Sequence, residues 1–121
     1  MSTTDYATYH ESEEYIHVWF YNEQDKPFHI GEKMYALNDD AYMNGYNWHA
    51  IFDYYLQKNA PDVMKFMDPD PEAGSYVAIY PNTPENLVRA QKFVEIMQFL
   101  IENETVLYKI VVEAADEIEW D

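Results

Sequence analysis

The most constraining feature of this sequence is an amphipathic pattern that runs from Pro84 to about Asn103. Its apolar residues recur at helical spacing and would form one buried stripe: Leu87, Ala90, Val94, Met97 and Ile101. Asn82 or Thr83 can cap the start of this helix, and Pro84 suits its first turn. A helix with one long apolar face has to pack against another element, so a layered domain is predicted.

The remaining segments alternate between strand and helix patterns. Four segments are predicted to be strands: 15–22, 28–37, 75–80 and 105–113. Aromatic and β-branched residues dominate the first of them, and the second is interrupted near Gly31. Asn44 is predicted to cap another helix, which reaches about Lys58 and is ended by Pro61. A short extra turn is expected over 63–67.

These elements predict a single α+β domain, with a mostly antiparallel sheet of about four strands and two main helices packed on one sheet face. Residues 1–14 are expected to be a loose acidic lead-in and 114–121 an acidic tail. Ile16, Val18 and Phe20 alternate with larger polar rings, and we expect them to share the core with Val77 and Ile79. The open sheet face would then be aromatic: Tyr15, His17, Trp19, Tyr21, Tyr76 and Tyr80.

Charge narrows the set of partners. The 121 residues include 23 acids and 7 bases, which gives a net charge of −16. Phosphate groups would be repelled, so neither nucleic acid nor an anionic membrane is expected as a direct partner, whereas a cationic partner would be attracted. The same acids could simply keep a small protein soluble. No secretion signal or apolar run of about 18 residues is present, so a cytoplasmic protein is expected.

No motif indicates catalysis, a metal or a cofactor. The sequence lacks cysteine, HExxH, GxSxG and a glycine-rich phosphate loop. In the stretch DPDPEAGSYVAIY, residues 68–80, three acids stand at positions 1, 3 and 5 of a possible calcium-binding loop: Asp68, Asp70 and Glu72. Its glycine comes one position late, however, and Ile79 stands where a bidentate acid is needed. His49 and Asp53 are suited to one helix face, but zinc needs about four ligands. We therefore expect neither a metal, a cofactor nor an enzyme.

Exposed aromatic and acidic side chains are the remaining signal. The 12 tyrosines exceed what one small core usually holds, and Tyr and Trp are enriched at protein-binding hot spots. The candidate partner-binding residues come from the open sheet face, the acidic turn and, as a second choice, the tail that ends at Asp121. They are Tyr15, His17, Trp19, Tyr21, Glu72, Tyr76, Tyr80, Asp116, Glu117 and Glu119.

The run Asp70-Pro71-Glu72-Ala73-Gly74, followed by an aromatic strand, a polar turn, an amphipathic helix and a final strand, resembles the immunity protein 51 family. The similarity extends from about Pro61 to Val112. Members are small bacterial proteins encoded beside polymorphic toxins, including those of contact-dependent inhibition, which they neutralise. The resemblance implies a toxin inhibitor that acts by tight binding, without turnover or cofactor. Together with the charge, it indicates a basic toxin such as a nuclease.

Two other classes remain open from the residues. A small acidic secretion or assembly chaperone would hold an extended partner segment, often as a homodimer. A small enzyme or ligand-binding domain would need a deep pocket with converging polar groups. For the inhibitor, a monomer or weak homodimer is expected when the protein is free.

Overall fold

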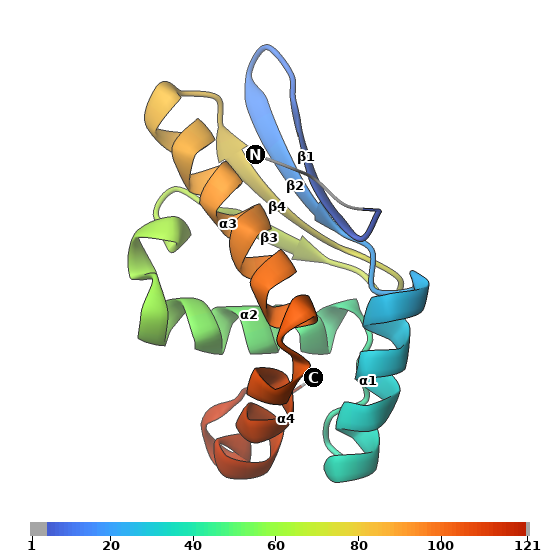
Figure 1. The fold of residues 1–121 in the computed structure, drawn as a ribbon. Helices are drawn as coiled ribbons and strands as arrows, with labels where there is room; N and C mark the ends of the chain where they lie inside the picture. Colours follow the sequence, from blue (N-terminus) through green and yellow to red (C-terminus); the bar gives the residue numbers. More distant parts are fainter. Residues whose placement is uncertain (1–4, 121) are drawn as a thin grey trace.

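The computed structural model describes residues 5–120, which form one α+β domain around a four-stranded antiparallel sheet (Figure 1). The strands are β1 (Ala7–Glu11), β2 (Tyr15–Phe20), β3 (Asp68–Pro71) and β4 (Tyr76–Pro81), in the order β1-β2-β4-β3. The helices are α1 (Asp25–Leu37), α2 (Gly45–Asn59), α3 (Pro84–Glu102) and α4 (Glu104–Glu113), with 3₁₀ turns η1 (Pro61–Met64) and η2 (Ala115–Glu117). The predicted fold class is confirmed.

The two main helices begin where the sequence predicts. At α2, Oδ1 of Asn44 accepts a hydrogen bond from the backbone nitrogen of Asn47 at 3.0 Å. At α3, Oγ1 of Thr83 accepts one from the backbone nitrogen of Asn86 at 3.1 Å. Each cap satisfies a backbone donor that has no partner within its helix. The predicted strands at β2 and β4 are also confirmed, and the predicted extra turn is present as η1, which begins two residues earlier than expected.

The strand predicted over 28–37 is wrong, because this segment belongs to α1. Ile30 and Met34, four residues apart, are buried on one side of the helix, while Phe28 and Tyr35 are exposed. Pro27 lies in the first turn, where a missing N–H costs nothing. Helical spacing was therefore present, but the run is short and Gly31 interrupts it.

The strand predicted over 105–113 is also wrong, because this segment forms α4. Its β-branched residues favour a strand. Only one face is buried, however, through Leu107 and Val111 at helical spacing, and Val112 is exposed. The helix packs against α1 and α3. Tertiary packing has thus overridden local propensity here.

Both chain ends are more ordered than expected. Within the predicted lead-in, residues 7–11 form β1, which pairs antiparallel with β2 and buries Ala7. Within the predicted tail, η2 is followed by the buried side chain of Ile118, and Trp120 packs against the core. The prediction of a loose lead-in is therefore wrong for residues 7–11, whereas the acidic tail also carries apolar side chains that reach the core. Residues 1–4 and Asp121 lie outside the described residues.

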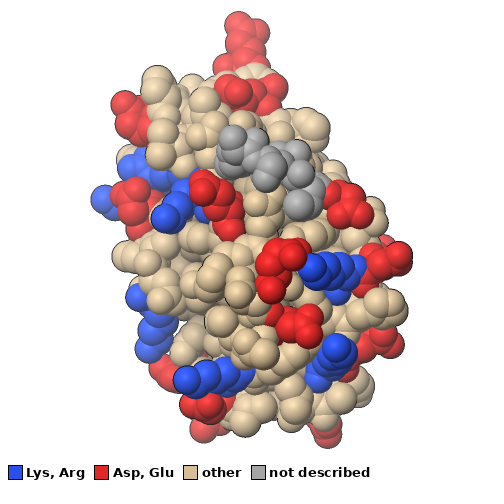
Figure 2. Space-filling model, in the orientation of Figure 1, with Lys and Arg blue, Asp and Glu red and all other residues tan. Residues whose placement is uncertain are grey.

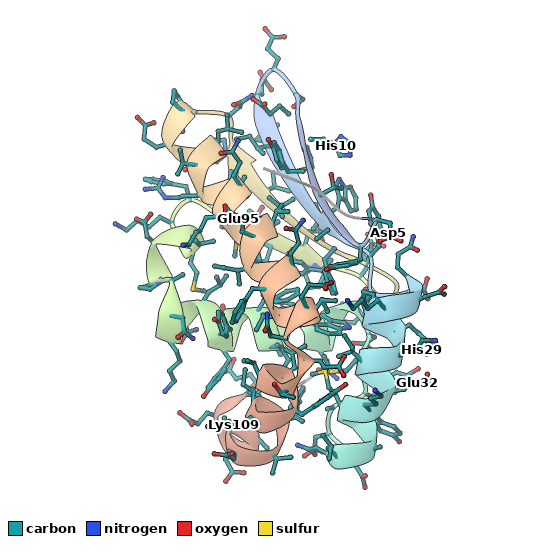
Figure 3. All side chains as sticks on the ribbon, viewed as in Figure 1. Asp5, His10, His29, Glu32, Glu95 and Lys109 are labelled. Atoms are coloured by element: carbon teal, nitrogen blue, oxygen red, sulfur yellow. The ribbon has the colours of Figure 1, made fainter. Side chains whose placement is uncertain are left out.

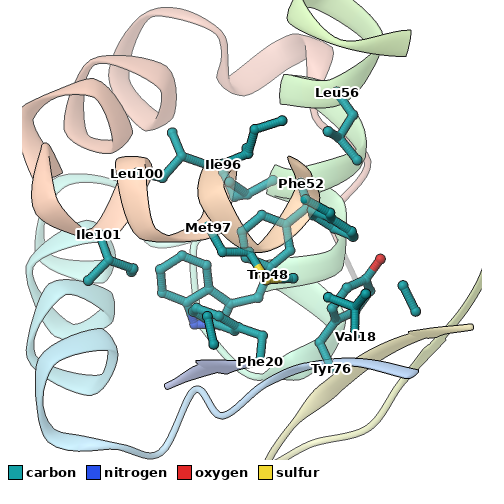
Figure 4. Packing of buried hydrophobic residues seen from close by; sticks show 14 of the residues in the cluster. Val18, Phe20, Trp48, Phe52, Leu56, Tyr76, Ile96, Met97, Leu100 and Ile101 are labelled. Atoms are coloured by element: carbon teal, nitrogen blue, oxygen red, sulfur yellow. The ribbon is translucent and has the colours of Figure 1, made fainter. Parts of the chain in front are cut away.

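The helices cover one face of the sheet, as predicted. In Figure 1, α3 lies across the strands and α2 crosses beneath it, while α1 and α4 pack together at the lower end. An aromatic cluster fills the space between sheet and helices (Figure 4). Phe52 lies at its centre, with ring centroids 5.0, 5.8, 5.4 and 5.7 Å from those of Phe20, Trp48, Tyr76 and Phe93.

The acidic, proline-rich stretch forms the edge strand β3, which the sequence did not predict. Pro69 and Pro71 pair with core-facing residues of β4, whereas Asp68 and Asp70 point to the open face. Glu72 donates its backbone N–H to Ser75 across the turn, so Pro69 and Pro71 occupy the positions whose N–H groups would point away from β4. Because proline has no N–H, this edge presents no outward donor at either position.

The turn after β3 packs closely on the start of α2. The backbone nitrogen of Gly45 donates to the carbonyl oxygen of Ala73 at 2.9 Å. The side-chain amide of Asn22 donates to the same oxygen at 3.3 Å. A Cβ at Gly45 would lie 1.7 Å from the carbonyl oxygen of Glu72, so only glycine fits there. The Asp-Pro-Glu-Ala-Gly run therefore has a structural role: it fixes the β3–β4 hairpin on α2.

Candidate functional site

The open face of the sheet carries the aromatic residues that were predicted on β2. Tyr15 is exposed, while His17, Trp19 and Tyr21 are half-buried. The rings of Trp19 and Tyr21 stack with their centroids 5.8 Å apart, and those of Tyr15 and His17 meet edge to face at 6.4 Å. We call this open surface, together with Val77, Ile79, Asp68 and Asp70, the sheet face. It joins large apolar area to polar ring atoms, a combination that suits protein binding.

Acidic residues border the sheet face. The register places Asp68 in one row with Ile79 and His17, and Asp70 in the next with Val77 and Trp19. At the far end, Glu11 ends β1 and the turn to β2 carries Glu13 and Glu14, all three exposed. None of the four strands contains Lys or Arg. The sheet face is therefore negative, with no Lys or Arg from the strands to offset it.

Tyr76 and Tyr80 are not on the sheet face, so their prediction as partner-binding residues is wrong. Both side chains are fully buried under α2 and α3, and Val77 and Ile79 lie on the opposite face, where Val77 is buried and Ile79 is half-buried. The expectation that Val77 and Ile79 share the helix-covered core is therefore also wrong. The register causes this, because Tyr76 pairs with core-facing Phe20 and Tyr80 with core-facing Ile16. The hydroxyl of Tyr80 donates to the carbonyl oxygen of Val63 at 2.6 Å. Burial raises the pKa of both phenols.

Glu72 and the C-terminal acids lie apart from the aromatic strand β2. Glu72 is exposed in the β3–β4 turn. Glu117 forms an ion pair with Lys58 at 3.1 Å. Glu117 and Glu119 line a cavity of about 450 Å³ against α2, which no residue of the sheet face lines. Asp116 is exposed in η2. The structure thus separates the predicted acids into two surfaces. Within residues 5–120, no group of three His, Asp or Glu side chains could hold a metal ion.

His49 lies beside the acidic cavity and gives a testable pH dependence. Its ring stacks on buried Tyr76, with centroids 5.5 Å apart. Burial lowers the pKa of His49 from its ordinary value of 6.5, and Asp53 partly opposes this. The unfolded chain therefore binds a proton more readily than the folded one, so the free energy of unfolding should fall as pH drops below about 6.5. The free energy of unfolding, measured with urea at several pH values between 7.5 and 5.5, should depend less on pH in His49→Gln than in the unchanged protein. An equal dependence on pH in the two proteins would contradict this.

A second aromatic surface was missed because α1 was predicted as a strand. Phe28 and Tyr35 project from α1, and Tyr42 from the segment before α2; they are 50%, 48% and 66% exposed. With Asn22, Glu23 and Glu32, they line a cavity of about 310 Å³, which we call the aromatic groove. The seven-residue spacing of Phe28 and Tyr35, beside buried Ile30 and Met34, is the signal that could have found it.

These surfaces define an acidic α+β domain of the kind that acts by binding another protein. The family model of immunity protein 51 matches residues 8–116, nearly the whole chain, and the chain belongs to this family. It is thus an immunity protein, a class that binds a cognate toxin and is generally non-enzymatic. No curated protein and no solved structure shows a significant match. None of the helices described is long and apolar enough to cross a membrane.

Proposed function

We propose that this protein neutralises a toxin domain of basic character by one-to-one binding through the sheet face. The observation that carries the proposal is the separation of charge in the fold. All seven Lys and Arg residues lie outside the strands, and five of them lie within 4 Å of an acid: Lys26, Lys33, Lys58, Lys65 and Arg89. Figure 2 views the helical side, where basic and acidic side chains are interspersed. The sheet face keeps its acids without such partners from the strands.

The chemistry of this face suits a toxin whose substrate is a polyanion. A nuclease cleft is basic because it holds phosphates. The carboxylates of Asp68 and Asp70 would take the places of those phosphates beside the basic side chains of the cleft. Trp19 and Tyr15 would supply the desolvated contacts that give such an interface most of its affinity. Glu72 would extend the acidic border at the end of the β3–β4 hairpin. Inhibition then requires only that the complex covers the cleft, so no turnover or cofactor is involved.

Trp19→Ala tests this surface. The variant should bind the toxin domain encoded beside this gene about thirtyfold more weakly, because losing a hot-spot tryptophan costs about 2 kcal/mol. Binding is measured by titration calorimetry at two salt concentrations, and affinity should also fall as salt screens the acids. Rescue of growth on co-expression with the toxin should weaken in parallel.

Phe99→Ala is the matched control, because Phe99 is an exposed aromatic residue on α3, away from the sheet face. It should bind the toxin as the unchanged protein does. Equal affinities for Trp19→Ala and Phe99→Ala would reject the sheet face as the contact. A stable dimer of the free protein that does not co-purify with the toxin would instead favour an assembly chaperone.

A further inference from the structure

Three exposed aromatic rings surround the aromatic groove. Phe28 and Tyr35 rise from the same side of α1, and Tyr42 faces Tyr35 edge to face, with ring centroids 5.9 Å apart. An exposed aromatic ring can offer its negative π face to a cation that enters such a hollow. Such an arrangement favours a flat or cationic group over a plain aliphatic one.

Two carboxylates and one unpaired acceptor add polarity to this hollow. Glu23 and Glu32 line it, and Glu32 is held by the ring of His29, whose Nδ1 lies 3.2 Å from the carboxylate (Figure 3). Asn22 also lines it and is only 4% exposed. The side-chain nitrogen of Asn22 donates a hydrogen bond to the carbonyl oxygen of Ala73. Among the described residues, its Oδ1 has no hydrogen-bond partner. A buried acceptor left unpaired is destabilising, so a small shift of Asn22 that lets Oδ1 accept from a ligand donor would be favoured.

We propose that the aromatic groove binds an arginine side chain of the toxin. A guanidinium group is planar, stacks on aromatic rings and carries five N–H donors, so it can contact a ring and a carboxylate together, and it can reach Asn22 Oδ1 once that buried side chain turns toward the groove. A lysine ammonium would satisfy the charge but not the stacking. An apolar side chain would leave Asn22 unpaired and would bury the carboxylates without a counter-charge.

This inference rests on the proposed function for the source of the arginine, but the groove can be tested without the toxin. The probe is the peptide acetyl-Ala-Arg-Ala-amide, titrated into the full-length ¹⁵N-labelled protein and followed by NMR. We expect saturable shifts of the Gly31 and Met43 amides and of the Asn22 side-chain amide. The same peptide with citrulline, which keeps the shape but removes the charge, should bind at least about tenfold more weakly, and the lysine peptide should lie between them.

Two variants locate the binding. Tyr35→Ala should weaken the arginine peptide at least about fivefold, whereas Tyr46→Ala, an exposed tyrosine outside the groove, should leave it unchanged. Equal shifts from arginine and citrulline, shifts centred on the acidic cavity near His49, or the absence of saturable shifts would each overturn the inference. Those results would not affect the comparison of toxin binding by Trp19→Ala and Phe99→Ala, which tests the proposed function. Conversely, a toxin that binds independently of Trp19 would reject the sheet face while the peptide result stood.

Discussion

Gly45→Ala is expected to lower the free energy of unfolding by about 3 kcal/mol or more. An alanine Cβ at this position would lie 1.7 Å from the carbonyl oxygen of Glu72 and 2.3 Å from that of Ser75. Both atoms are backbone, and the turn that carries them is closed by the hydrogen bond from Glu72 to Ser75. The clash can be relieved only by separating the β3–β4 hairpin from α2. Urea unfolding followed by circular dichroism measures the loss.

Gly74→Ala is the control, since Gly74 lies in the same turn. Its Cβ would meet the Glu23 carboxylate at 2.9 Å, and an exposed side chain can rotate away. No glycine among the described residues has a positive φ, so backbone strain does not enter either comparison. The loss for Gly74→Ala should stay below about 1 kcal/mol. Similar losses for the two variants would show that the hairpin is not held as tightly as its contacts indicate.

Phe52→Ala should cost about 3–5 kcal/mol, because it deletes the ring at the centre of the aromatic cluster (Figure 4). Phe52 is 1% exposed, and its ring meets aromatic rings from the sheet, from α2 and from α3. Removing it leaves a cavity that rigid neighbours cannot refill. The effect is measured as the shift in the urea midpoint at unchanged slope.

Phe52→Leu distinguishes packing from simple loss of apolar area. Leucine keeps much of the volume but none of the edge-to-face ring contacts, so a loss smaller than for alanine, but still above about 1 kcal/mol, is expected. Phe99→Ala, which removes a half-exposed ring, should cost less than either. If Phe52→Ala cost no more than Phe99→Ala, the cluster could not be the centre of the core.

The starts of α2 and α3 could be predicted from the sequence, because a single capping residue decides where each helix begins. Asn44 and Thr83 fix the starts of α2 and α3 because each side chain accepts from the backbone three residues later. The faces of β2 followed from alternation, which put Tyr15 and Trp19 on the open side. The part of the sheet face that lies on β2 could therefore be predicted from the sequence.

Long-range contacts decided the rest. The segment of α4 is β-branched and reads as a strand, yet it lies against α1 and α3 rather than at a sheet edge. The orientation of β4 depends on its register with β2, which local alternation cannot supply, so Tyr76 and Tyr80 were placed on the wrong face. The aromatic groove was missed for the same reason, since it exists only once α1 is a helix.

The two prolines of β3 bear on how much of this protein can accumulate safely. An inhibitor that works by one-to-one binding has to outnumber its target, so it must tolerate a high concentration of free copies. Exposed strand edges with free donors are where copies add to one another and grow into fibrils. Pro69 and Pro71 leave the outer side of β3 without donors at both outward positions, so under the proposed one-to-one binding a surplus of free protein is less readily recruited into aggregates through this edge.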